Sequence, residues 1–164
     1  MPPALGGVHL QLHWKEHELR TYRPNHTAVS VRDMNASLDF YGALGFKVVN
    51  RTTFDGEELV HIQLGEYLLE LFAFRKNAGQ PPLQLGYGNG PESLGVKHLA
   101  FATDDIHAAL VDLKERGLAD DSISVEGEAE GKVQWFFITD PDGMWVEIIQ
   151  EDRFPVYAAP WPGM

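Results

Sequence analysis

The sequence predicts an α+β fold made of two tandem modules, each with one strand, one helix and three further strands. Three observations support this class. The chain repeats itself at an offset of 72 residues. Each copy contains a helical pattern that begins after an aspartate and stops at a glycine. Strand-like segments follow each helix, and the last of them carries a glutamate among apolar residues.

The internal repeat is clearest when His26 is aligned with His98. Other identical pairs then follow without a gap: Ala28 and Ala100, Asp33 and Asp105, Ala36 and Ala108, Leu38 and Leu110, Gly45 and Gly117. A repeat of this kind indicates one structural unit that is used twice.

The first module begins with a strand at residues 26–31 (HTAVSV). Asp33 is suited to cap a helix that continues through "MNASLDFYGAL" and stops at Gly45. Three strands are expected next: "FKVVNR", "EELVHIQL" and, after a short turn at Gly65 and Glu66, "YLLELFAF".

The second module repeats this order. A strand in "HLAFAT" precedes Asp105, the expected cap of a helix in "IHAALVDLKER" that stops at Gly117. Three strands are expected in "SISVE", "KVQWFFIT" and "MWVEIIQ". The tight turn "DPDG" between the last two sets the register that aims Glu147 to one side of the sheet.

The chain therefore divides into five segments: an N-terminal extension (1–23), the first module (24–74), a Gly/Pro-rich linker (75–95), the second module (96–150) and an aromatic, Pro-rich tail (151–164). The linker is long enough to have a role at the site, and a simple connector is the alternative. The histidines of the extension, His9, His13 and His17, are spaced for one helix face, but the alternation around them favours an exposed arm.

Composition excludes several classes of function. The 164 residues are 44% hydrophobic and 23% charged, which is ordinary for a globular protein. A net charge of −11 argues against a nucleic-acid partner. With no cysteine, any metal must be held by imidazole and carboxylate groups. Neither a signal peptide nor a membrane span is apparent, so we expect a cytoplasmic protein without a membrane partner.

The first strand of each module has one face with a histidine and only small side chains. His26 shares its face with Ala28 and Ser30, and His98 shares its face with Ala100 and Ala102. The bulky residues of both strands point to the opposite face, where a helix can pack. The histidine faces therefore leave room for another molecule.

Glu70 and Glu147 each lie in the middle of an apolar strand. An unpaired buried carboxylate is costly, and a bound cation removes this cost. Taken singly, a strand histidine is more typical of a core and a hairpin glutamate of a solvent-facing position. Because the two His–Glu pairs occupy matching places in the repeat, they instead suggest a divalent metal with two positions left for water or substrate.

These stretches resemble the vicinal oxygen chelate superfamily, which contains glyoxalases, bleomycin-resistance proteins and extradiol dioxygenases. The matching segments are "HTAVSVRDMNASLDFYGALGF", "YLLELF", "HLAFATDDIHAALVDLKERG" and "FFITDPDGMWVEII". They cover most of residues 26–150. The resemblance implies that the two βαβββ modules form a cupped mixed sheet, with the helices on the convex face and a metal in the concavity.

Within the superfamily, the sequence is similar to glyoxalase I. This resemblance implies that His26, Glu70, His98 and Glu147 bind a divalent metal such as Ni, Zn, Co, Mn or Fe(II). It also implies a lyase or isomerase reaction on a small substrate with vicinal oxygens, through an enediolate-type intermediate. Either Glu147 or Glu70 would be the catalytic base that moves the proton.

Two positions depart from the bacterial glyoxalase I pattern. Ser30 stands where an arginine typically holds a carboxylate of glutathione, and Phe74 stands where an asparagine is typical. Other expected substrate-binding residues are aromatic: Phe72, Trp135, Phe137 and Trp145. An acidic protein also has no evident attraction for an anionic tripeptide. We therefore expect a neutral or aromatic small-molecule substrate rather than glutathione.

Two other functions stay open. His26, His98 and Glu147 alone make a two-His-one-carboxylate set typical of an Fe(II) dioxygenase, with Glu70 as a spectator or base. A non-catalytic antibiotic binder of the bleomycin-resistance kind needs only an aromatic cleft, and the retained histidines and glutamates argue against it. Because the superfamily commonly forms dimers, we expect a homodimer.

Overall fold

A computed structural model describes residues 24–83, 95–128 and 132–151. The first module consists of β1 (His26–Val31), α1 (Met34–Ala43), β2 (Lys47–Phe54), β3 (Glu57–Leu64) and β4 (Tyr67–Ala73), followed by a short 3-10 helix, η1 (Arg75–Asn77). The second consists of β5 (His98–Ala102), α2 (Ile106–Glu115), β6 (Glu126–Gly127), β7 (Val133–Thr139) and β8 (Trp145–Glu151). His9, His13 and His17 of the N-terminal extension lie outside these residues, and so does the C-terminal tail beyond residue 151.

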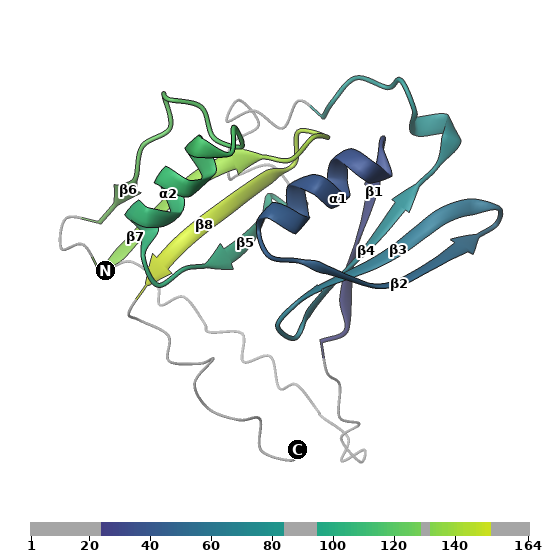
Figure 1. Cartoon of the computed structure of the whole chain (residues 1–164), viewed down its shortest axis with the longest axis horizontal. Helices are drawn as coiled ribbons and strands as arrows, with labels where there is room; N and C mark the ends of the chain where they lie inside the picture. The colour runs from purple at the N-terminus through teal and green to yellow at the C-terminus, as the bar shows by residue number, and fades with distance from the viewer. Residues whose placement is uncertain (1–23, 84–94, 129–131, 152–164) are drawn as a thin grey trace, which may run out of the picture.

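Both modules have the same strand topology (Figure 1). The strand order is β1-β4-β3-β2 in one four-stranded sheet and β5-β8-β7-β6 in the other. In each module the first strand is parallel to the last one, and the remaining pairs are antiparallel. The predicted α+β class and the two βαβββ modules are confirmed.

The helix boundaries follow the expected capping signals. The Asp33 carboxylate accepts hydrogen bonds from the backbone N–H groups of Asn35 and Ala36, at 2.9 and 3.1 Å. Asp105 caps α2 in the same way through the Ala108 N–H, at 2.9 Å. The glycines after both helices, Gly45 and Gly117, have positive φ values of 98° and 72°, which side chains disfavour.

One predicted strand is wrong over most of its length. Only the last residue expected in "SISVE" belongs to a strand, because β6 is limited to Glu126–Gly127. The Asp120 carboxylate instead accepts a hydrogen bond from the Ser122 N–H at 2.7 Å, and the Ile123 N–H donates to the Asp120 carbonyl at 3.2 Å. This turn satisfies locally the N–H groups of Ser122 and Ile123, which a longer strand would have paired.

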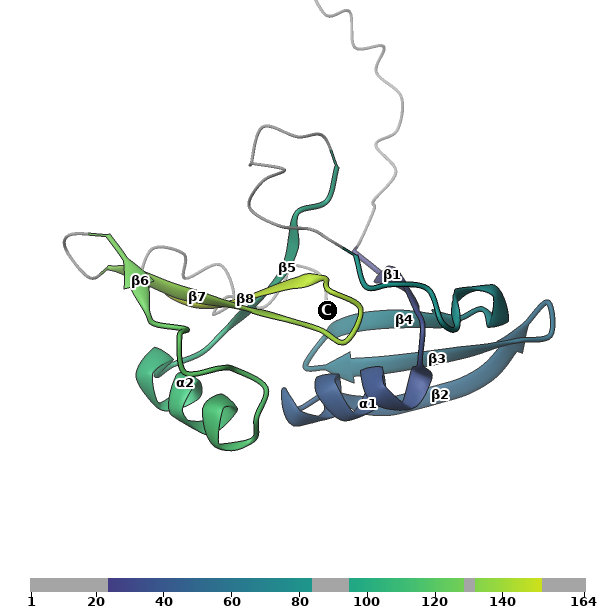
Figure 2. The same cartoon turned by 90° about the horizontal axis from the view of Figure 1, so that it is seen from above.

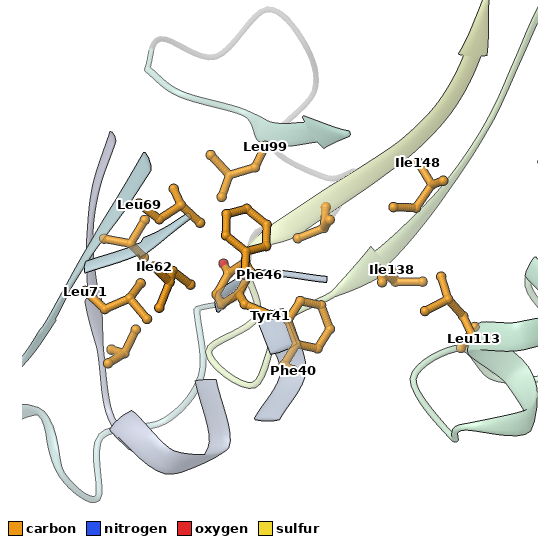
Figure 3. Packing of buried hydrophobic residues seen from close by; sticks show 14 of the residues in the cluster. Phe40, Tyr41, Phe46, Ile62, Leu69, Leu71, Leu99, Leu113, Ile138 and Ile148 are labelled. Atoms are coloured by element: carbon orange, nitrogen blue, oxygen red, sulfur yellow. The ribbon is translucent and has the colours of Figure 1, made fainter. Parts of the chain in front are cut away.

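One hydrophobic core joins the two modules. It includes Tyr41 and Phe46 from the first module and Leu99, Ile138 and Ile148 from the second (Figure 3). Phe46 contacts Phe101 across the modules, with ring centroids 5.3 Å apart. Both helices lie on the same side of the two sheets (Figure 2). The arrangement of the modules is thus fixed by shared apolar packing.

The strand faces divide as the alternation predicts. Val29 and Val31 of β1, Leu99 of β5, and Val146 and Ile148 of β8 are all buried. The alternate residues of β1 and β5, which include both histidines, are exposed. None of the helices in the described ranges is long and apolar enough to cross a membrane.

Candidate functional site

Strand pairing places each histidine beside its glutamate. In the first sheet Ala28 pairs with Glu70, and in the second Ala100 pairs with Glu147. Each histidine precedes that alanine by two residues and so shares its face. His26 Nε2 lies 3.4 Å from Glu70 Oε2. His98 Nε2 lies 3.0 Å from Glu147 Oε2.

In both pairs the imidazole is partly exposed to solvent and the carboxylate is largely buried. The histidine side chains are 38% and 36% exposed, and the glutamate side chains are 16% and 15% exposed. Imidazole nitrogen and carboxylate oxygen are the donors that borderline divalent metals accept, so each pair fits half of such a site.

The structure shows the four predicted ligands as two pairs, one in each module. In the described part of the chain, no three His, Asp or Glu side chains are arranged so that they could hold a metal ion. The four-ligand metal site therefore stays a prediction. It requires that the two pairs be brought together.

A third histidine joins the first pair and was not among the predicted site residues. His61 Nε2 lies 3.0 Å from Glu70 Oε1, and its side chain is 20% exposed. His61 Nδ1 is 3.2 Å from the Asn50 amide nitrogen. The sequence held a signal for this contact. Counting back from the Gly65–Glu66 turn pairs Leu64 with Tyr67 and, three steps on, His61 with Glu70.

The second module differs at the matching position. Phe137 pairs with Glu147 on β7 and β8, as His61 pairs with Glu70 on β3 and β4. The Phe137 ring meets His98 edge-on, with centroids 5.4 Å apart. One glutamate thus lies between two imidazoles, while the other lies between an imidazole and an apolar ring.

Aromatic rings flank both pairs, as the sequence predicts. Phe72 stacks on Phe74 at 5.7 Å between centroids and meets Phe54 edge-on at 5.8 Å. In the second module Phe137 contacts Trp145 at 5.1 Å. Trp135 precedes Phe137 by two residues on β7 and so lies on the same strand face. Their roles in substrate binding stay predictions.

A cavity of about 490 Å³ adjoins the histidine face of β1. Ser30, one of the predicted substrate-binding residues, lines it. The other polar lining includes Asn77 and Gln80 from the start of the predicted linker, and Asp142 from the turn between β7 and β8. The described start of the linker therefore borders a cavity, and a role of the linker at the site stays a prediction.

Arg32 at the rim of this cavity is engaged by other parts of the protein. Its Nε donates to Asp142 Oδ1 at 2.6 Å, and its Nη1 donates to the Gln80 carbonyl at 3.0 Å. Its Nη2 donates to the Pro141 carbonyl. The ion pair with a nearly buried carboxylate neutralises both charges and ties β1 to the turn of the second module.

Asp140 organises that turn. Its Oδ1 accepts hydrogen bonds from the Asp142 and Met144 N–H groups, at 2.9 and 2.8 Å. Its Oδ2 accepts from the Tyr41 hydroxyl at 3.0 Å. Burial raises the pKa of Asp140 above its usual range, and these hydrogen bonds oppose the shift. Burial and the nearby Asp140 charge raise the pKa of Tyr41, so the hydroxyl remains a donor.

Comparisons with known proteins agree with this architecture. The lactoylglutathione lyase of Schizosaccharomyces pombe is 26% identical over 83% of this chain, which spans about half (50%) of that enzyme's length. The mitochondrial methylmalonyl-CoA epimerase of Homo sapiens is 30% identical, over 78% of this chain and 73% of the enzyme. The crystal structure of a glyoxalase family protein from Enterococcus faecalis superimposes with a TM-score of 0.61, at 28% identity, over 77% of this chain and 96% of that one.

The family model of the glyoxalase, bleomycin resistance protein and dioxygenase superfamily matches residues 23–148. This range contains both His–Glu pairs. The chain therefore belongs to the Glyoxalase/Bleomycin resistance protein/Dioxygenase superfamily.

Proposed function

We propose that the protein is a divalent-metal-dependent lyase or isomerase that acts on a small molecule with neighbouring oxygen atoms. The observation that carries this proposal is the pair of repeat-related His–Glu contacts, His26 with Glu70 and His98 with Glu147. Similarity to a lactoylglutathione lyase and to an epimerase supports an enzymatic role.

His26, Glu70, His98 and Glu147 would hold the metal, and Ni, Zn, Co, Mn or Fe(II) suits this donor set. When bound, such an ion supplies Lewis-acid stabilisation of negative charge on the substrate oxygens.

Glu147 is our choice for the catalytic base. The reaction needs a carboxylate that removes a proton from carbon, as the C–H bond breaks, and returns it to the neighbouring carbon. Glu70 lies between His26 and His61, whereas Phe137 faces Glu147 at the position that matches His61. The carboxylate of Glu147 is therefore freer to turn between metal and substrate.

A second copy of the chain would complete the site. The modules share a core through Phe46 and Phe101, and the Tyr41–Asp140 contact joins them as well. Bringing both His–Glu pairs together within one chain would disrupt this packing. A homodimer that places one pair from each chain at a common metal avoids that cost.

We propose that the part of the substrate that extends away from the metal carries no charge. The cavity beside Ala28 and Ser30 offers the hydroxyl of Ser30 and the amides of Asn77 and Gln80, while Arg32 is already paired with Asp142. Ser30 and Phe74 also stand where a glutathione-specific enzyme would carry an arginine and an asparagine. We expect weak or absent turnover of methylglyoxal with glutathione, and robust turnover would contradict this specificity.

An Fe(II)-dependent dioxygenase is the second candidate, because the His61 contact engages one of the two Glu70 oxygens. If Glu70 does not bind the metal, the remaining set is His26, His98 and Glu147, which leaves positions for O₂ and substrate. The two candidates therefore differ in whether Glu70 binds the metal.

The deciding experiment is elemental analysis of the full chain purified without added metal. We expect near-stoichiometric metal in the wild type and in a His107→Ala control, which changes an exposed histidine on α2. We expect loss of metal in His26→Ala. Iron with substrate-dependent O₂ uptake selects the dioxygenase, and Ni, Zn, Co or Mn selects the isomerase. A folded wild-type protein without metal, or unchanged metal content in His26→Ala, contradicts the proposed site.

A further inference from the structure

The geometry points to His61 as a positioning residue that fixes the orientation of the Glu70 carboxylate, with Asn50 fixing the His61 ring in turn. This inference rests on the proposed metal site, because it explains how one of its ligands is held. It assigns a role to two residues, His61 and Asn50, that lie outside the four predicted ligands.

The contacts that run from Asn50 through His61 to Glu70 have one direction. The Asn50 amide nitrogen lies 3.2 Å from His61 Nδ1, and an amide nitrogen can only donate. Nδ1 must therefore accept, which leaves the ring hydrogen on Nε2. Nε2 lies 3.0 Å from Glu70 Oε1, so the protonated ring nitrogen is the one in contact with the carboxylate. The tautomer that Asn50 selects is thus the one that can hold Glu70.

This arrangement gives the two Glu70 oxygens different tasks. Oε1 is engaged by His61, while Oε2 faces His26 Nε2 at 3.4 Å. A cation bound by His26 would therefore contact Oε2 of Glu70, while Oε1 stays in contact with His61. A polar contact of this kind to the second oxygen of a carboxylate ligand orients the ligand and tunes its affinity for metal.

A β-bulge places Asn50 in this chain of contacts. Lys47 pairs with Gln63 and Val48 with Ile62, and this register would put Val49 opposite His61. The register shifts between Val48 and Asn50, so Asn50 becomes the partner of His61 instead. An extra residue in β2 therefore exchanges an apolar neighbour for an amide, and bulges beside functional sites often re-aim a side chain in this way.

The second module provides the natural comparison. Phe137 occupies the register position of His61, so the fold accepts a phenyl ring there. His61→Phe copies the second module, keeps an aromatic ring and removes the donor. His61→Gln keeps an N–H donor near the place of Nε2. His107→Gln changes an exposed histidine of α2 and serves as the matched control.

The test measures metal affinity by chelator competition and the visible absorption of the Co(II)-loaded protein. We expect His61→Phe to fold, to bind metal about 10- to 100-fold more weakly and to shift the Co(II) bands. His61→Gln should recover most of the affinity, and His107→Gln should match the wild type. Wild-type affinity and spectrum in His61→Phe, or equal weakening by His61→Gln, would overturn the inference.

A metal-free measurement separates this inference from the proposed function. Nitrogen-15 NMR of the histidine rings reports which nitrogen carries the hydrogen. We expect the Nε2–H tautomer for His61 in the wild type and a loss of this preference in Asn50→Leu. A wild type that binds no metal contradicts the proposed function alone. A His61 ring with its hydrogen on Nδ1 contradicts the positioning chain whether or not metal binds.

Discussion

The hydroxyl of Tyr41 donates a 3.0 Å hydrogen bond to the carboxylate of Asp140, which lies 99 positions further along the chain. Tyr41 belongs to α1 of the first module, and Asp140 begins the turn between β7 and β8 of the second. Both side chains are buried. This contact joins the modules on the side of the core and leaves the His–Glu pairs on the open strand faces.

Replacing Tyr41 by Phe should destabilise the protein because it removes a hydrogen bond to a buried carboxylate. We expect the free energy of unfolding to fall by about 1.5–3 kcal/mol at neutral pH. The Tyr41 hydrogen bond lowers the pKa of Asp140, so its loss raises that pKa further. The destabilisation should therefore be larger at neutral than at acidic pH. Urea unfolding at both pH values measures this difference, and an equal loss at both would contradict it.

Asp140→Asn should change how stability depends on pH. The pKa of Asp140 is raised in the folded protein, mainly by burial, from an ordinary value of 3.8. Folding therefore favours the protonated form of Asp140. The stability that this preference contributes is lost as the pH rises through the pKa of the folded protein. An asparagine has no such loss. The free energy of unfolding of Asp140→Asn, relative to that of the wild type, should therefore increase with pH above 3.8. Urea unfolding at several pH values measures this difference. The same pH dependence in both proteins would contradict a raised pKa of Asp140.

Replacing Gly143 by alanine should lower the stability more than the same change at Gly56. The φ of Gly143 is +84°, and a Cβ there would lie 2.3 Å from the Leu83 carbonyl oxygen. The Leu83 N–H also donates to the Asp142 carbonyl at 2.6 Å, so the linker is held against this turn. Gly56→Ala is the matched control, because its φ is +77° but nothing lies within 4 Å.

The two alanine variants separate backbone strain from a steric clash. Gly56→Ala should cost about 1 kcal/mol, the usual penalty for a side chain with positive φ. Gly143→Ala should cost clearly more, because the linker backbone must also move. Thermal unfolding of both variants provides the measurement. Equal changes in the two would show that Leu83 moves away without cost.

Features that have a local sequence pattern could be predicted, whereas contacts between distant residues could not. The helices, seven of the eight expected strand segments and both His–Glu pairs follow from local periodicity, capping residues and the repeat. His61 needed the register of one hairpin, which the Gly65–Glu66 turn encodes. The Arg32–Asp142 and Tyr41–Asp140 contacts join residues about a hundred positions apart, and no local pattern specifies such pairs.

Glu147→Gln and Glu70→Gln should have different effects if the two glutamates divide their roles. Gln keeps the shape of the side chain but cannot take a proton from carbon. We expect Glu147→Gln to lower kcat about 10²- to 10⁴-fold, which is the typical contribution of a general base. Glu70→Gln should act mainly through weaker metal binding, so added metal should restore part of its activity. Full activity in Glu147→Gln would contradict its role as base.

The proposed homodimer predicts that two inactive variants complement each other. One variant carries His26→Ala and the other carries His98→Ala, so each lacks one imidazole of the proposed metal site. If each site combines the first module of one chain with the second module of its partner, a mixed dimer has one site with both defects and one intact site. Dissociating and reassociating an equal mixture should then restore activity and metal binding, because part of the dimers contain a wild-type site. If all four ligands came from one chain, every site would keep a defect and the mixture would stay inactive. Size-exclusion chromatography with light scattering checks that both variants form dimers before they are mixed.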